Sequence, residues 1–150
     1  FHVQPKKNDT RMHKLITVYN VIHRTYQVLK TKGINVLARR DHHAAVFGKS
    51  MMVYGGQFEN GSFSNELLNF DLEYFDWSYI TFKQHIEPFS NGACCSVMSI
   101  KSKQTLTRLS DTILDGVYFF GGKNAKGELP NKLKFLKPFC AQGKVQSVEW

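Results

Sequence analysis

The sequence lacks the features that mark secreted and membrane-spanning proteins. It holds 3 cysteines, Cys94, Cys95 and Cys140, in 150 residues, and an odd number with an adjacent pair does not suggest a disulfide framework. Free cysteines buried on strands are the favoured interpretation, and they fit a reducing compartment. No stretch is long and apolar enough to span a membrane, and no signal-peptide core is present. We therefore expect a cytoplasmic protein.

Motifs for metal binding and for common catalytic chemistries are also missing. No CxxC or HxxxH spacing occurs. The neighbours His42 and His43 would point to opposite faces of a strand, as would Cys94 and Cys95. There is no GxSxG motif, and the glycine-rich stretches end strands instead of opening helices, which excludes a phosphate loop. The sequence thus predicts no metal site, no cofactor and no catalytic residues.

Basic charge is abundant but unevenly distributed. The formal net charge is +8. Residues 1–40 carry nine Lys/Arg against one acidic residue, 41–100 carry two against seven, and 101–150 carry nine against four. The basic residues never form a long run, which favours solvated loops over a nucleic-acid surface. A basic nucleic-acid-binding module stays an alternative, and a steep salt dependence of binding would support it.

Short apolar runs separated by turn residues predict strands. The runs Ala44–Phe47 and Met51–Tyr54 flank Gly48–Ser50, which predicts a tight hairpin. Residues 67–72 and 77–82 predict a third and a fourth strand. Both faces of the resulting sheet would be apolar, so we expect it to lie between two similar sheets.

Several spaced residues of this stretch fall in a recognisable order. They are Arg40, His43, Gly55-Gly56, Asn65-Glu66-Leu67, Asp71 and Trp77. In this order the stretch resembles a kelch repeat, with Glu66 where Asp is commoner. The resemblance implies one four-stranded blade of a β-propeller, and a structural hydrogen bond for His43.

Weaker copies of the pattern flank this stretch. Downstream, Gly121-Gly122 matches the first glycine pair and Trp150 matches Trp77. Upstream, Asn20 stands at the position of Asp71, and Tyr26 at that of Trp77. The resemblance thus divides the chain into a lead-in loop (1–13), the second half of a blade (14–38), a complete blade (39–84), and a blade (85–150) with an insertion at 101–114.

The predicted fold is therefore all-β: a kelch-type β-propeller, of which the chain holds about three consecutive four-stranded blades. Closed propellers need about 4 to 8 blades. The chain also begins at Phe1. We therefore expect a piece of a longer protein, or a second chain that supplies the missing blades.

The resemblance implies a non-enzymatic protein–protein interaction scaffold, a subunit of a larger cytoskeletal or ciliary assembly. Its partners would be other proteins, with no small-molecule substrate, nucleic acid or membrane. A propeller enzyme similar in fold to galactose oxidase, with its site outside this segment, is the other alternative.

Loops at the ends of propeller strands present the binding face, which here means Gln57–Ser64 and Lys123–Pro130. The predicted partner-binding residues are Gln57, Phe58, Glu59, Asn60, Phe63, Lys123, Asn124 and Lys126. Phe58 has two interpretations: it tucks back onto its own sheet, the commoner case, or it anchors a partner.

Overall fold

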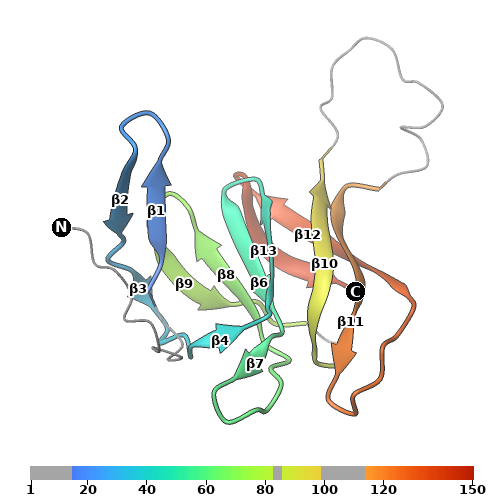
Figure 1. Ribbon diagram of the computed structural model, residues 1–150. Helices are drawn as coiled ribbons and strands as arrows, with labels where there is room; N and C mark the ends of the chain where they lie inside the picture. Colours follow the sequence, from blue (N-terminus) through green and yellow to red (C-terminus); the bar gives the residue numbers. More distant parts are fainter. Residues whose placement is uncertain (1–14, 83–85, 99–113) are drawn as a thin grey trace.

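The computed structural model describes residues 15–82, 86–98 and 114–150, and within them every regular element is a β-strand (Figure 1). The prediction of an all-β fold is confirmed. The lead-in loop, and all of the predicted insertion except Leu114, lie outside the described residues. The strands are β1 (Thr17–Asn20), β2 (Thr25–Val28), β3 (Lys32–Gly33), β4 (Arg39–Arg40), β5 (His43–Phe47), β6 (Ser50–Tyr54), β7 (Gln57–Phe58), β8 (Leu67–Asp71), β9 (Asp76–Tyr79), β10 (Phe89–Val97), β11 (Gly116–Asn124), β12 (Leu133–Ala141) and β13 (Lys144–Glu149).

The central stretch folds as an antiparallel meander in the order β5-β6-β8-β9, with the short β3 added in parallel at the edge of β9. The predicted hairpin and all four predicted strands are confirmed. The loop expected at Gln57–Ser64 also contains β7, which pairs with β4 beside the sheet.

The C-terminal part forms a second antiparallel meander, β10-β11-β12-β13. Strand β10 begins at Phe89, four residues before the run Ala93–Ile100, which the sequence pattern alone predicts as the strand. Asn91, within this early part of the strand, has a positive φ of 60°, and the pairing with β11 keeps its register on both sides of it. Strand β11 continues through Gly121-Gly122, because its partner β10 extends alongside them.

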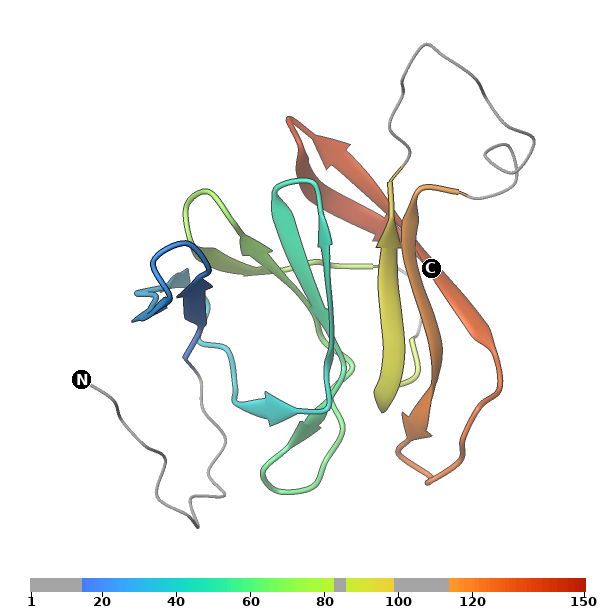
Figure 2. The same ribbon diagram turned by 45° about the horizontal axis from the view of Figure 1, so that its top comes forward.

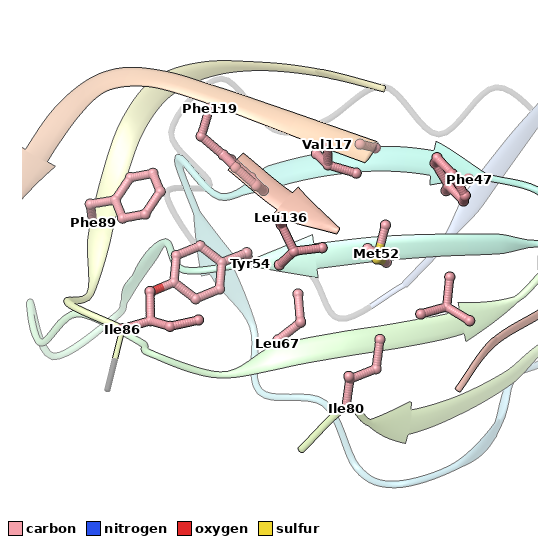
Figure 3. Close-up of a cluster of buried hydrophobic side chains, with 12 residues drawn as sticks. Phe47, Met52, Tyr54, Leu67, Ile80, Ile86, Phe89, Val117, Phe119 and Leu136 are labelled. Atoms are coloured by element: carbon pink, nitrogen blue, oxygen red, sulfur yellow. The ribbon is translucent and has the colours of Figure 1, made fainter. Parts of the chain in front are cut away.

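The two meanders pack face to face, and Figure 3 shows the side chains that fill the space between them. Tyr54, Phe89 and Phe119 form an aromatic cluster, with ring centroids 5.0–6.0 Å apart. The buried members of this core, here called the inter-sheet core, are Ala45, Phe47, Met52, Tyr54, Leu67, Ile80, Ile86, Phe89, Val117, Phe119, Leu136 and Val145.

The other face of the central meander is apolar as well. Its buried residues Val53, Leu68, Phe70 and Trp77 form a second cluster. Side chains from the β1–β2 hairpin and from the segment before β4 cover this cluster, and they are Ile16, Leu29, Ile34 and Val36. The prediction that this sheet is apolar on both faces is confirmed, but the prediction of a similar sheet on each side holds for one face only, since the described residues cover the other face with a two-stranded hairpin and the segment before β4.

Two hairpins far apart in sequence share one geometry. In β1–β2 the Asn20 side-chain oxygen accepts hydrogen bonds from the backbone N–H of the second and third following residues, and Asp71 does the same in β8–β9. Each turn ends in a residue with positive φ, Arg24 at 53° and Phe75 at 57°. The predicted correspondence of Asn20 with Asp71 is therefore visible as an identical side-chain-to-backbone turn.

The tip of the β12–β13 hairpin ties the second meander to the first. Its two-residue turn has positive φ at Gln142 and Gly143, the combination of a type I′ turn. The Gly143 carbonyl accepts a hydrogen bond from the Lys49 N–H at 2.7 Å, and Lys144 Nζ lies 2.7 Å from an Asp71 oxygen. Burial acts to raise the pKa of Asp71, but bonds from Lys144 and two backbone N–H groups outweigh it and hold the pKa below its usual value.

Candidate interaction surface

The loop after β6 is a compact turn held by its own backbone. The Phe58 N–H donates to the Ser62 carbonyl at 2.9 Å, and the Gly61 N–H donates to the Phe58 carbonyl at 3.0 Å. Gly61 has φ of 84°, a conformation that favours glycine. The Asn60 side chain accepts from both the N–H and the hydroxyl of Ser62. The loop is thus a defined protrusion with few free dihedral angles.

The loop after β11 has the same backbone plan. The Asn124 N–H donates to the Glu128 carbonyl at 3.0 Å, and the Gly127 N–H donates to the Asn124 carbonyl at 2.9 Å. Gly127 also has φ of 84°. Even the glycine pairs before the two loops agree, since φ is 69° and 89° at Gly55-Gly56 and 71° and 91° at Gly121-Gly122.

Both loops lie on the same edge of the two packed sheets, the lower edge in Figure 2. A cross-sheet hydrogen bond marks this edge, from the Gly56 N–H to the carbonyl of Phe89, the first residue of β10. The two glycine pairs therefore bring equivalent loops to one side of the molecule. The β5–β6 and β8–β9 turns lie at the opposite ends of their strands, joined by a bond from the Leu72 N–H to the Lys49 carbonyl.

Phe58 and Gln57 are held against their own sheet. The Arg39 guanidinium lies 5.0 Å from the centre of the Phe58 ring, a cation–π contact. Arg40 donates to the side-chain oxygen of Gln57 at 2.9 Å, and the Gln57 amide donates to the Gly61 carbonyl. Phe58 and Phe63 are half-buried. This geometry favours the interpretation in which Phe58 packs back onto its own sheet.

Asn124 is buried inside its loop. It is 2% exposed, and its amide donates to Glu87 and Glu128 while its carbonyl oxygen accepts from the N–H groups of Lys126 and Glu128. Its side chain thus bonds within the loop and also to Glu87, which precedes β10. Its place in the structure is that of a residue that shapes the loop.

The side chains that reach solvent from this edge are a smaller set. Of the predicted residues, Glu59, Asn60, Lys123 and Lys126 are exposed. Leu129, in the second loop, is 76% exposed and was not among the predicted residues. The sequence signal for Leu129 is an apolar residue in a polar loop, after Lys123 and Lys126 and directly before Pro130. The edge therefore presents one acidic and one basic protrusion with an apolar side chain.

The arginine used by the fold is one residue upstream of the predicted one. Arg39, with its side chain 4% exposed, pairs with Glu66 and donates to the Ser64 hydroxyl and the Gly55 carbonyl. The side chain of Arg40 is 62% exposed. The strand alternation of β4 causes this difference, because consecutive residues point to opposite sides.

The histidines and cysteines behave partly as predicted. His43 is buried and His42 exposed, on opposite faces of the chain. The buried Nε2 of His43 accepts a hydrogen bond from the Gly92 N–H at 3.2 Å, which requires the neutral ring. Burial, the largest cause, lowers the pKa of His43. The described residues contain no cluster of three or more side chains that could hold a metal ion.

The prediction that the cysteines are buried is wrong for two of the three. Cys94 is half-buried and its thiol donates to the Ala44 carbonyl at 3.3 Å, but Cys95 and Cys140 are exposed. Cys95 lies on the outer face of β10, which the described residues leave uncovered, and Cys140 lies near the tip of the β12–β13 hairpin. All three thiols are free. No helix among the described residues is long and apolar enough to cross a membrane.

Comparison with known proteins adds no relative to these observations. The chain matches no family model, and no curated protein matches it.

Proposed function

We propose that the chain is part of a kelch-type β-propeller that serves as a non-enzymatic scaffold for protein–protein interaction. The observation that carries this proposal is repetition. Two consecutive four-stranded meanders stack face to face, and their glycine pairs, loops and turns have matching backbone geometry. A propeller is the architecture in which such sheets recur around an axis.

The outer face of the second meander supports the continuation of this stacking. Phe120 and Leu133 pair across β11 and β12 as Tyr54 and Leu67 pair across β6 and β8. Tyr54 and Leu67 are 0% and 1% exposed under the second meander, whereas Phe120 and Leu133 are 51% and 64% exposed. Apolar residues at the same positions are expected to be covered by a further sheet.

Partner binding by the common loop edge is the second part of the proposal. The first loop exposes the acidic residue Glu59 and the second the basic residue Lys126. This pair of charges favours a protein partner whose surface carries charges of both signs. Leu129 supplies the apolar contact that a binding site needs near its centre. In this role the protein would be a cytoplasmic subunit of a larger assembly, such as a cytoskeletal or ciliary one.

The test places a photo-cross-linking amino acid at Glu59, Lys126 or Tyr74 in the protein expressed in its own cell. Tyr74 is 62% exposed but belongs to the β8–β9 turn at the opposite edge. We expect one and the same protein partner to be captured from Glu59 and Lys126 and not from Tyr74. Capture from all three positions alike, or capture of nucleic acid, would contradict the proposal.

A further inference from the structure

The β1–β2 hairpin repeats the β8–β9 hairpin in its hydrogen bonding. A bond of 2.9 Å joins the Leu29 N–H to the Ile16 carbonyl, and another of 2.9 Å joins the Ile80 N–H to the Leu67 carbonyl. The ring centroids of Tyr19 and Tyr26 are 4.7 Å apart, as are those of Phe70 and Trp77. Strand β1 therefore corresponds to β8, and the β1–β2 hairpin is an incomplete copy of the central meander.

The free edge of β1 is the main difference between the two hairpins. The second edge of β8 is paired with β6 over five residue pairs. Among the described residues β1 pairs only with β2. In an antiparallel pair, every second residue bonds to the partner strand. Because the Ile16 carbonyl bonds to the N–H of Leu29, Val18 also bonds to β2, and the N–H and C=O groups of Thr17 and Tyr19 point to the open edge. All of β1 is exposed.

A mostly apolar cavity of about 170 Å³, open to solvent on one side, lies next to Ile16, the residue before β1, and its lining includes the polar residues Arg39 and His42. Its lining includes Ile16 and Val36 on one side and Ala44, Met51 and Val53 of the central meander on the other. By register, the corresponding residues of β10 and β11 are Cys94, Val117 and Phe119. Those residues pack in the inter-sheet core with Ala45, Met52 and Tyr54 of β5 and β6.

The cavity is thus the place where side chains of a β5–β6-like strand pair would lie. An engineered apolar cavity of about 150 Å³ holds a benzene ring, so a cavity of this size takes one or two apolar side chains. An exposed strand edge supplies backbone hydrogen bonds to an added strand, and a pocket beneath it selects alternate side chains. Both features occur together at β1, where the pocket lies against the central meander.

We propose that the open edge of β1 and this cavity form a strand-addition site for an antiparallel β-hairpin from another polypeptide. Its edge strand pairs with Thr17–Asn20, and its inward residues are apolar at the positions of Ala45, Met52 and Tyr54. The inference deepens the proposed propeller architecture and rests on it for the identity of the occupant. It does not depend on the loop edge, so the two experiments can fail separately.

The experiment titrates the full chain, labelled with ¹⁵N, with a synthetic peptide of the sequence of residues 43–54 flanked by lysines for solubility. We expect amide hydrogen exchange at Thr17 and Tyr19 to slow by about tenfold or more, while Val18, already bonded to β2, changes little. A peptide with the Met52→Asp substitution should give no protection, because its carboxylate would enter the apolar cavity.

Two variants of the protein and one matched control make the test sharper. Thr17→Pro removes an outward N–H but no bond to β2, and should weaken peptide binding by about tenfold, whereas Thr17→Ala should not. Ala44→Phe fills the cavity from the other side and should also weaken binding, whatever the state of β1.

Three outcomes would overturn the proposal. The first is unchanged exchange at Thr17 and Tyr19 at saturating peptide. The second is equal protection by the Met52→Asp peptide. The third is protection of the Thr17 and Tyr19 amides in the absence of peptide. Protection that increases with protein concentration would show that a second copy of the chain occupies the edge. Protection that does not depend on concentration would show that the chain itself occupies it.

Discussion

The two faces of the central meander are both apolar, yet they are covered to different extents. On one face the second meander supplies four strands, and the inter-sheet core is closed. On the other face the β1–β2 hairpin supplies two strands, and a cavity of about 170 Å³ remains beside Met51 and Val53. The difference teaches that equivalent positions in a repeated sheet contribute stability only where the neighbouring sheet is complete.

The largest expected difference in the free energy of unfolding is between alanine variants of two matching aromatic residues, Trp77 and Tyr26. Trp77→Ala should destabilise the fold by about 3–5 kcal/mol, because Trp77 is 8% exposed and its removal leaves a cavity. Tyr26→Ala, at the matching position but 76% exposed, should cost about 0.5 kcal/mol or less. Urea unfolding followed by circular dichroism measures both. Equal losses would mean that the Tyr19–Tyr26 face is covered in solution.

A second pair compares the positions at the start of each hairpin. Leu67→Ala should cost about 2–5 kcal/mol, since Leu67 is 1% exposed in the inter-sheet core. Ile16→Ala, at the matching and half-buried position beside the cavity, should cost about 1 kcal/mol, because water already reaches the site. The same unfolding curves apply, and addition of the hairpin peptide should increase the cost of Ile16→Ala.

A third pair tests which arginine the sheet uses. Arg39→Gln should cost about 2 kcal/mol, less than for a fully buried pair because Glu66 keeps 29% of its exposure. Arg40→Gln should change stability by about 0.5 kcal/mol or less. The free energy of unfolding at low and high salt decides between them. A larger loss for Arg40→Gln would restore the assignment made from the kelch pattern.

The smallest effect is a pH dependence at the seam between the meanders. The pKa of His43 is lowered below 6.5 in the folded chain, first by burial, so protonation favours the unfolded chain. Its contribution to stability is complete above pH 6.5 and is lost as the pH falls from 6.5 through the folded-state pKa, by at most about 1.4 kcal/mol per pH unit.

The control for this dependence is the neighbouring histidine. The pKa of His42, although this residue is exposed, is also lowered, first by partial desolvation of the ring and then by the positive charge of Arg39. His43→Gln should flatten the curve of unfolding free energy against pH between 5 and 7, and His42→Gln should leave most of the slope. If the unfolding free energy of the His43→Gln variant still falls with pH between 7 and 5, the pH dependence belongs to another group.

The local patterns in the sequence predicted the four strands of the central meander but misplaced several side chains. Alternation of apolar residues and turn residues was enough for β5, β6, β8 and β9, because each of these signals is local. The early start of β10 was missed, since Phe89 becomes a strand residue only through its pairing with Asn124. Burial of Asn124 was missed for the same reason, because Glu87 comes from a distant segment.

The candidate interaction surface divides in the same way. Glycine pairs and polar residues located both loops in the sequence, because positive φ and turn chemistry are properties of single residues. Which loop side chains reach solvent depended on contacts with other segments. Arg39 covers Phe58, so this ring is withdrawn, whereas Leu129 stays exposed although it is apolar.

By itself the sequence determined that this chain folds into short antiparallel strands with apolar residues on both faces of the central sheet. Those properties follow from the period of two and from turn residues, which act over a few positions. Only the tertiary structure decided that one face is closed and the other keeps a cavity and an open strand edge. The number of strands that a neighbouring sheet supplies is a property of segments far apart in the chain.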